Sequence, residues 1–331
     1  MTDLTNLTAR ELAHLIRRKS VSPVEVMQAT LARIEAQKEL NAFITVTAKQ
    51  ALQDAKEAEA MVMAGGALPP LHGVPYSVKD LTLTAGVRTT MGSRLYADNI
   101  PQENALSVAK AKAAGAILIG KTTTPEFGHK QSASGPLFGQ TLNPVNRRVT
   151  PGASSSGAAA AVAAGLGPLA LGTDGGGSIR IPASCCGIVG MKPTLGNVGN
   201  LQPPDLFTAN SYVGPMARDI ADTALLYEVI RGGDKRDPFG QAPTPTGRPT
   251  IPSLHGVKVA WLPTAGNRID PQVEQLTTAA VQAMADAGAE VEQIELDFVA
   301  LEKHFLVLLE STLAARLGPQ LADIEARLDP S

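Results

Sequence analysis

The sequence has little of the chemistry that cross-links or metal sites require. Its 331 residues include only two cysteines, Cys185 and Cys186, and these are neighbours. A framework of disulfides is therefore excluded, and the chain fits a reducing compartment such as the cytoplasm. An adjacent pair is also a poor metal site, because metal-binding cysteines usually have residues between them. We expect both cysteines to be small core residues.

Histidines are few and scattered along the chain. None has a cysteine or a carboxylate at the spacing of metal ligands, and there are five in all: His14, His72, His129, His255 and His304. The sequence also lacks a GxSxG elbow and a GxxxxGK[ST] loop. These absences argue against a Ser-His-Asp hydrolase of the α/β-hydrolase type and against a P-loop nucleotide site.

The chain has little net charge, because its basic and acidic residues nearly balance. Charged residues make up 18% of the chain, its formal net charge is -2, and it has no blocks of like charge. There is thus no electrostatic reason to expect nucleic acid or an anionic membrane as partner. The longest weakly polar stretch, 151–173, is interrupted by glycine, proline and serine. It predicts a buried turn, helix and strand rather than a membrane span.

What the sequence does contain is a helical start followed by alternating strands and helices. Two capping boxes mark early helix starts: Thr8 with Glu11, and Ser22 with Glu25. Residues 1–65 are predicted as an N-terminal helical segment and 66–331 as a single α/β core. Strands are expected at 73–78, 116–120, 168–173, 258–262 and 290–296, and helices at 105–115, 155–164, 216–231 and 271–287.

Three segments carry polar side chains where chemistry is conceivable. Lys79 ends an apolar strand, where a lysine most often reaches out to solvent. The serine run 154–156 precedes an alanine-rich helix, where it is most simply an N-cap. Three glycines precede Ser178, and such a run is either a flexible turn or a nest of N–H groups that holds an oxyanion. Each segment alone has an ordinary structural explanation.

Together these segments resemble the amidase signature family, over essentially the whole chain. The resemblance rests on six segments in chain order: GVPYSVKD (73–80), TAGVRTTMGS (84–93), QTLNPVN (140–146), TPGASSSGAAAAVAAGL (150–166), LALGTDGGGSIRIPASCCGIVGMKPT (169–194) and GPMARDIAD (214–222). It implies an α/β fold with a central mixed sheet covered by helices on both faces. It also implies hydrolysis of amides with no metal or organic cofactor.

The resemblance assigns a Ser–cis-Ser–Lys triad. Lys79 is the implied base, Ser154 the proton bridge after a cis peptide bond, and Ser178 the nucleophile. A lysine acts as a base only when neutral, so we expect burial to lower its pKa. A charged lysine has only donors, which is why a hydroxyl must stand between it and the nucleophile. The implied oxyanion hole consists of the backbone N–H groups of Gly175, Gly176, Gly177 and Ser178.

Other residues are expected to support the triad. Ser155, next to the bridge, belongs to the same implied hydrogen-bond network. Asp174 and Arg180 flank the nucleophile, and we expect them to fix its loop. The candidate substrate contacts lie in the loop before the serine turn: Phe127, His129 and Phe138.

The sequence departs from the family pattern at several positions. Ala153 and Ser156 stand where the family has glycine, so a side chain there is strained if the backbone needs positive φ. Gly175 replaces a residue that is often β-branched, and Ser211 replaces a frequent aspartate. Family members also continue well past this length, so we expect the C-terminal part of the fold to be missing.

We predict an amidase that converts a small carboxamide to the acid and ammonia or an amine, and that forms a homodimer. One alternative is the glutaminase subunit of a tRNA-dependent amidotransferase, which belongs to the same family and needs a partner protein. Another is a catalytically impaired, amidase-like binding protein. The triad does not separate the first two, because both kinds of protein have it.

Overall fold

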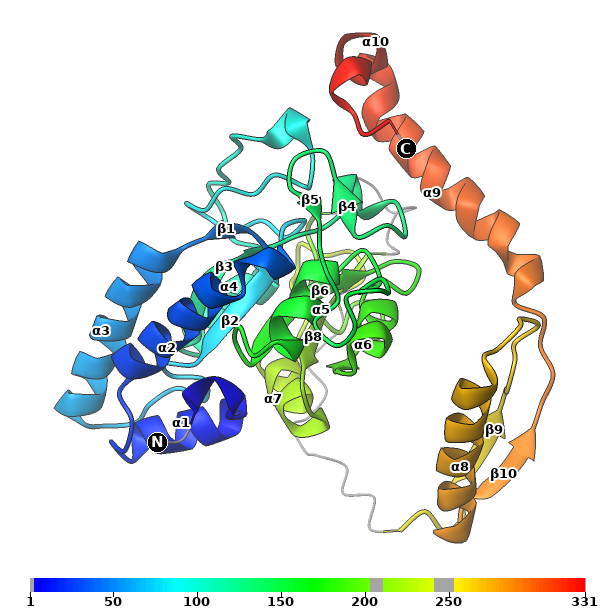
Figure 1. Ribbon diagram of the computed structural model, residues 1–331, viewed down its shortest axis with the longest axis horizontal. Helices are drawn as coiled ribbons and strands as arrows, with labels where there is room; N and C mark the ends of the chain where they lie inside the picture. The colour runs from blue at the N-terminus through cyan, green and yellow to red at the C-terminus, as the bar shows by residue number, and fades with distance from the viewer. Residues whose placement is uncertain (1–2, 203–210, 241–252, 331) are drawn as a thin grey trace. The chain divides into compact units, whose positions relative to one another are not determined.

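The computed structural model describes residues 3–202, 211–240 and 253–330. It consists of two compact units, one formed by Met1–Thr244 with Gln320–Ser331 and the other by Pro245–Pro319. A six-stranded sheet with the strand order β1-β3-β2-β6-β8-β7 forms the centre of the first unit (Figure 1).

This sheet is mixed. β2 pairs in parallel with both β3 and β6, whereas β1, β8 and β7 run antiparallel to their neighbours. Because β2 and β6 are adjacent and parallel, their carboxyl ends, Lys79 and Asp174, lie at the same edge of the sheet. The strands are β1 (Phe43–Val46), β2 (Pro75–Lys79), β3 (Ile117–Thr122), β6 (Leu169–Asp174), β7 (Val189–Gly190) and β8 (Tyr212–Ala217).

Helices cover both faces of the sheet. Leu171 packs in a core cluster with residues of α1, α4 and α7, whereas its neighbour Ala170 packs in another with residues of α5 and α6. Successive strand residues point to opposite faces, so the predicted two-sided α/β architecture is confirmed. The helices of this unit are α1 (Ala9–Arg17), α2 (Pro23–Ala36), α3 (Ala48–Ala64), α4 (Leu106–Ala113), α5 (Ser156–Ala163), α6 (Arg180–Cys186), α7 (Ile220–Ile230) and α10 (Leu321–Ile324).

The first two of these helices begin where the sequence predicts. The Thr8 side chain accepts a hydrogen bond from the N–H of Glu11, and the Glu11 carboxylate accepts one from the N–H of Thr8. Ser22 and Glu25 form the second capping box in the same way. Each box satisfies backbone donors that a helix start otherwise leaves unpaired.

One predicted helix starts later than expected. The sequence predicts a helix over 216–231, but α7 begins at Ile220, and Met216 belongs to β8. The side chain of Asp219 accepts a hydrogen bond from the N–H of Asp222 and so caps the helix at that point. The residues before this cap pair with β6 and β7 instead.

The N-terminal segment also differs from its prediction as wholly helical. Within it, β1 runs along the edge of the sheet and pairs with β3. Three consecutive β-branched residues, Ile44, Thr45 and Val46, suit a strand better than a helix.

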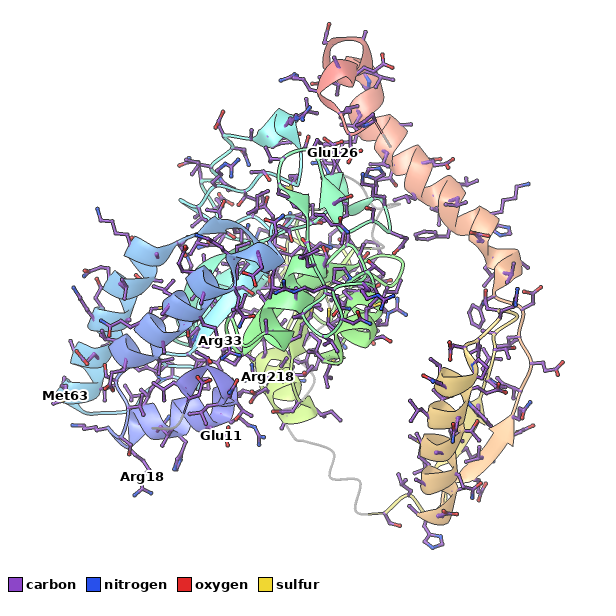
Figure 2. The ribbon with its side chains drawn as sticks, viewed as in Figure 1. Glu11, Arg18, Arg33, Met63, Glu126 and Arg218 are labelled. Atoms are coloured by element: carbon purple, nitrogen blue, oxygen red, sulfur yellow. The ribbon has the colours of Figure 1, made fainter. Side chains whose placement is uncertain are left out.

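Two arginines anchor the C-terminal end of α5. Nε of Arg33 donates to the carbonyl of Ala164 at 2.8 Å. Arg218 donates to the carbonyls of Val162 at 3.3 Å and Leu7 at 2.5 Å. Both arginines are labelled in Figure 2. Cations that bind the last carbonyls of a helix stabilise its C-terminal end. The two arginines therefore fix α5 at the end opposite to the serine turn, which precedes its first residue.

The second unit has a small sheet of its own. Its two strands pair in parallel, and a parallel pair needs a crossover connection, which α8 supplies. The strands and helix predicted over this region are confirmed, but they do not extend the main sheet. The elements are β9 (Lys258–Trp261), α8 (Pro271–Asp286), β10 (Glu290–Gln293) and α9 (Glu302–Leu317).

Short elements complete the described chain. Among the helices of the described ranges, none combines the length and apolar character that a membrane crossing requires. The 3₁₀ turns are η1 (Leu4–Asn6), η2 (Lys38–Leu40), η3 (Arg94–Tyr96), η4 (Glu126–Gly128), η5 (Val299–Leu301), η6 (Gly318–Gln320) and η7 (Glu325–Arg327), and the hairpin strands are β4 (Ser134–Gly135) and β5 (Gly139–Gln140).

Candidate active site

Lys79 is the last residue of β2 and is completely buried. Its Nζ donates to Oγ of Ser154 at 2.6 Å and to Oγ1 of Thr173 at 2.8 Å. Burial lowers the pKa of Lys79 to about 7, although the negative charge of Asp174 opposes this shift. The side chain therefore does not reach solvent, and near neutral pH it can be uncharged and accept a proton.

Ser154 lies in the tight turn that leads into α5. The peptide bond between Ala153 and Ser154 is cis. Gly152 has φ +76°, and a Cβ at this position would lie 2.7 Å from Cα of Pro182. The turn therefore requires glycine there, and it brings the nearly buried hydroxyl of Ser154 to the amine of Lys79.

The two glycine replacements in this turn are accommodated. Neither Ala153 nor Ser156 has positive φ, so their side chains cause no strain of that kind. Ala153 is completely buried, and Ser156 is the first residue of α5. The buried hydroxyl of Ser156 has no hydrogen-bond partner among the described residues. It is not part of the contacts that surround Lys79.

Ser155 joins the turn to the loop that bears Ser178. Its N–H donates to the carbonyl of Ser178 at 3.1 Å. Its Oγ donates to the carbonyl of Thr173 at 3.2 Å and accepts from the N–H of Thr173 at 3.3 Å. Within the described chain, no hydrogen bond joins the hydroxyls of Ser154 and Ser178. The structure thus brings the two serine loops together through Ser155.

The backbone N–H groups of residues 175–178 differ in whether they already donate a hydrogen bond. The N–H of Gly177 donates to Oδ1 of Asp174 at 2.8 Å. Those of Gly175, Gly176 and Ser178 donate to no acceptor in the part of the chain that the structure describes. The expected set of four oxyanion donors is therefore reduced to three candidates.

Asp174 and Arg180 form an ion pair that fixes this loop. Arg180 donates to Asp174 through both Nε and Nη2, each at 2.9 Å. The same carboxylate accepts the N–H groups of Gly177 and Ile179. Burial alone would raise the pKa of Asp174, but the hydrogen bonds from Arg180 and the backbone outweigh it, and the pKa is lowered. The carboxylate is thus ionised and turned toward its own loop.

Two of the three expected substrate contacts, Phe127 and His129, flank Gly128, which lies close to Ser154. Phe127 belongs to η4, and His129 follows it, with its Nδ1 2.5 Å from the carbonyl of Glu126. A Cβ at Gly128 would lie 3.1 Å from Oγ of Ser154. The turn that carries these side chains therefore packs directly against the candidate proton bridge.

Phe138 lies in the β4–β5 hairpin. Its carbonyl accepts a hydrogen bond from Nδ2 of Asn41 at 2.6 Å, and its ring packs against Gly135. These contacts are with the hairpin and with the residue that follows η2, not with Lys79 or the serines.

Both cysteines have free thiols. Burial raises the pKa of Cys186 to about 12, and the neighbouring Cys185 adds to the shift. A thiol that stays protonated is a poor nucleophile and metal ligand. In the described ranges, no three His, Cys, Asp or Glu side chains gather where they could hold a metal ion.

Sequence reasoning missed two polar residues beside the site. Thr173 is a direct partner of Lys79, and its place just before the glycine run was the available signal. Lys121 is a second completely buried lysine, and it is 3.8 Å from the carboxylate of Asp80. It follows the apolar strand AILIG, the same pattern that drew attention to Lys79.

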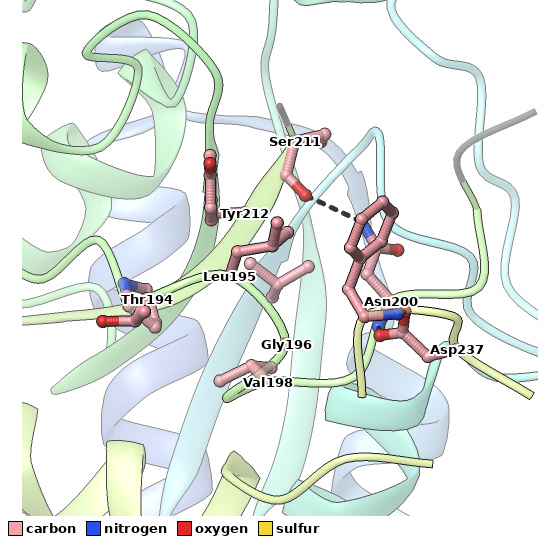
Figure 3. Close-up of a pocket in the computed structure, with 11 residues that line it drawn as sticks. Thr194, Leu195, Gly196, Val198, Asn200, Ser211, Tyr212 and Asp237 are labelled. Carbon is pink, nitrogen blue, oxygen red and sulfur yellow. Dashed lines mark hydrogen bonds between the residues drawn. The ribbon is translucent and has the colours of Figure 1, made fainter. Parts of the chain in front are cut away.

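A small pocket lies near the start of β8 (Figure 3). Tyr212 contributes to its wall and is the register partner of Asp174. The pocket therefore lies beside the strand that leads to the loop of Ser178. Nδ2 of Asn200 donates to the carbonyl of Ser211 at 2.9 Å and closes one side. The lining residues include Thr194, Leu195, Val198, Asn200, Tyr212 and Asp237.

Known proteins resemble this chain over most of its length. The family model described as Amidase matches residues 25–318. A glutamyl-tRNA(Gln) amidotransferase subunit from Geotalea daltonii is 40% identical over 99% of this chain and 70% of its own length. An acylamidase of Rhodococcus erythropolis is 39% identical over 86% of this chain and 61% of its own length.

A solved structure supports the same relationship. A bacterial aryl acylamidase of the amidase signature family matches 97% of this chain and 66% of its own, with a TM-score of 0.86 and 29% identity. The chain thus spans between about three fifths and seven tenths of the length of these relatives. Both the fold and the sequence lead to one conclusion: the chain belongs to the amidase signature family.

Proposed function

We propose that the protein hydrolyses the C–N bond of a carboxamide through an acyl-enzyme on Ser178. One observation carries the proposal. Lys79 is completely buried, its pKa is lowered to about 7, and its amine is 2.6 Å from the hydroxyl of Ser154. A fully buried lysine that has no carboxylate at ion-pair distance among the described residues is costly for stability, and a role as base explains it.

The first half of the proposed reaction forms the acyl-enzyme. Ser178 gives its proton to Ser154, and Ser154 passes its own to the neutral amine of Lys79. Oγ of Ser178 attacks the carbonyl carbon, and the negative charge goes to the carbonyl oxygen. The N–H groups of Gly175, Gly176 and Ser178 are the proposed donors to this oxyanion.

The second half releases the products. The proton returns through Ser154 to the leaving nitrogen as the C–N bond breaks, and ammonia or an amine departs. Water then gives a proton to the same relay and attacks the acyl carbon. The bond between the acyl carbon and Oγ of Ser178 breaks, the relay returns the proton to Oγ, and the carboxylic acid departs. The cycle uses no redox step and is proton-balanced.

The test is ammonia or amine release from a panel of aliphatic, aromatic and amino-acid amides. Ser178→Ala is the control, because it removes the proposed nucleophile. A fluorophosphonate probe should label Ser178 in the unmodified protein, identified by mass spectrometry of the labelled peptide. Hydrolysis that persists in Ser178→Ala would reject the mechanism.

A glutaminase role is the second candidate. It is favoured by the 40% identity to a glutamyl-tRNA(Gln) amidotransferase subunit over almost the whole chain. In that case glutamine is hydrolysed, and the rate rises when partner subunits are added. Glutamine turnover that is unaffected by partners, or broad amide turnover without glutamine, would favour the amidase.

A reducing compartment and a homodimer complete the proposal. The two free thiols support a reducing environment such as the cytoplasm. The homodimer is tested by light scattering coupled to size-exclusion chromatography, where a mass near that of one chain would reject it.

A further inference from the structure

Lys121 is the other buried lysine beside this site. It is completely buried on β3, where its register partner on β2 is Val78. Neighbouring residues of a strand point to opposite faces, so Lys121 and Lys79 lie on opposite sides of the sheet. The catalytic proposal gives Lys121 no role, and its charge is costly to bury without one.

The amine of Lys121 binds several points of one loop. It donates to the carbonyl of Thr82 at 2.5 Å, to Oγ1 of Thr84 at 3.0 Å and to Oγ1 of Thr89 at 2.8 Å. It also lies 3.8 Å from Oδ1 of Asp80. All of these partners are buried, so a single cation ties together the departing and returning arms of the loop that follows β2.

The same loop is closed by the residue next to Lys79. The carboxylate of Asp80 accepts the N–H of Thr90 at 2.8 Å and also its hydroxyl. The carbonyl of Asp80 accepts the N–H of Met91 at 3.2 Å. The geometry of the loop is therefore set at Asp80, one residue from the candidate base.

From this loop the contacts continue to Ser154. The carbonyl of Met91 accepts the N–H of Phe127 at 2.8 Å, which holds η4 in place. A Cβ at Gly128 would lie 2.7 Å from Cδ1 of Leu81 and 3.1 Å from Oγ of Ser154. Leu81 and η4 thus pack tightly against the side of Ser154, and a shift in the loop would move that hydroxyl.

We propose that Lys121 is a positioning residue for the Lys79–Ser154 pair. It closes the loop that leaves β2 at Lys79 and packs η4 against Ser154. It also keeps the Asp80 carboxylate paired, so that this charge does not hold the proton on Lys79. The inference rests on the proposed function, because it concerns the same proton relay.

The charges around the two lysines predict the direction in which loss of Lys121 would shift the pKa of Lys79. Asp174 is the charged neighbour that affects Lys79, and Arg180 already pairs with it. Lys121 faces Asp80, and Lys112 of α4 adds a weaker repulsion. Without Lys121 the carboxylate of Asp80 has no cation at ion-pair distance in the described chain. An unpaired anion next to Lys79 favours its protonated form, so the base would become active only at higher pH.

The experiment measures the rate at which a fluorophosphonate probe labels Ser178 between pH 5.5 and 9, which requires no identified substrate. We expect Lys121→Met to slow labelling by roughly 10-fold to 100-fold, as misplacement of a catalytic group does. We also expect the acid limb of the profile to move up by about one pH unit. Adding Asp80→Asn to Lys121→Met should return the limb to its original pH but not restore the rate.

Lys110→Met is the matched control. Lys110 also binds three carbonyls, those of Ile230, Arg231 and Gly232, but it lies on α4 away from the serines. Its labelling profile should not change. Thr89→Val removes only one acceptor of Lys121 and should slow labelling several-fold, so it decides the matter if Lys121→Met does not fold.

The outcomes separate the two proposals. If the unmodified protein is not labelled at Ser178, the proposed function fails. If it is labelled, and both Lys121→Met and Thr89→Val keep its rate and its pH limb, the role of Lys121 is overturned. A slower rate with an unmoved limb would overturn the charge-pairing part and retain the positioning part.

Discussion

Lys79 and Lys121 end apolar stretches of neighbouring strands, and both are completely buried. Burial lowers the pKa of each to about 7. Both amines donate to two hydroxyls and one carbonyl: Lys79 to the hydroxyls of Ser154 and Thr173 and the carbonyl of Thr173, and Lys121 to two threonine hydroxyls and the carbonyl of Thr82. They differ in that Lys121 also has the carboxylate of Asp80 at 3.8 Å. Burial alone therefore does not distinguish a base from a structural cation.

The two lysines differ in the kind of group that would be left unpaired if the lysine lost its charge or were removed. A hydroxyl can both donate and accept, so Ser154 has a partner role whether Lys79 is charged or neutral. A buried carboxylate can only accept while it is ionised, so Asp80 depends on the cation beside it. Burial raises the pKa of Asp80, and the charge of Lys121 opposes that shift. In the proposed reaction Lys79 exchanges a proton with Ser154, whereas Lys121, while it is protonated, pairs with the charge of Asp80.

The largest expected effect comes from Lys79→Met. It removes the proposed base, and loss of a general base costs up to about 10⁴-fold in rate. Amide hydrolysis and labelling of Ser178 should both fall to that extent. Stability to urea should not decrease, because no buried carboxylate depends on Lys79 as its ion-pair partner within the described chain. A stable variant that retains more than a tenth of the activity would contradict the assignment.

Lys121→Met should lower the free energy of unfolding more than Lys79→Met does, although it slows labelling of Ser178 less. Removing one partner of a buried ion pair typically costs about 3–5 kcal/mol, because the remaining charge is left without compensation. The free energy of unfolding is measured by urea denaturation below pH 7, where Lys121 is protonated and the pair is charged. Adding Asp80→Asn removes the stranded charge and should recover part of the loss. If the single substitution is neutral, Asp80 and Lys121 are not an energetically coupled pair.

How much of this could be foreseen from the sequence depends on the range of the interactions. The capping boxes follow from local patterns and are found as predicted, and β2 lies at Pro75–Lys79 against the predicted 73–78. The start of α7 differs from the helix predicted over 216–231, because the Asp219 cap, not apolar spacing, decides where the helix begins. The adjacency of Lys79 and Ser154 came from the family resemblance, since nothing local indicates a contact between residues 75 positions apart.

Lys121 shows the limit of that reasoning most clearly. Its acceptors are about 30 to 40 residues earlier in the chain, and only the folded loop brings them together. The engagement of the Gly177 N–H by Asp174 was likewise beyond the sequence, because it depends on one turn of backbone geometry. Motifs identify residue types, but the partners of each atom come from the three-dimensional structure.

Both buried lysines should make the free energy of unfolding rise with pH above neutrality. An unfolded lysine has a pKa near 10.4, so between pH 7.5 and 8.5 the unfolded state holds more protons than the folded state. The free energy of unfolding then rises with pH by up to about 1.4 kcal/mol per unit for each such lysine. Lys79→Met should lose that increment relative to the unmodified protein, and so should Lys121→Met combined with Asp80→Asn.

The thiols and Tyr76 act in the opposite direction at higher pH, because burial raises their pKa values. Their contribution is common to all these proteins and cancels in the difference. The measurement is a series of urea denaturation curves at several pH values. Equal slopes for Lys79→Met and the unmodified protein would mean that Lys79 keeps an ordinary pKa and is not poised as a base.

The smallest expected effect is a shift in the pH dependence of Ser178 labelling that distinguishes the carboxylate of Asp174 from that of Asp80. The charge of Asp174 opposes the lowered pKa of Lys79, so Asp174→Asn should lower that pKa further. The acid limb of Ser178 labelling should then move down by about half a pH unit, because Arg180 already compensates part of the charge. Lys121→Met is expected to move the same limb up. Opposite shifts would identify Asp80 as the carboxylate whose pairing matters for the base, whereas an upward shift in Asp174→Asn would mean that the nucleophile loop had reorganised.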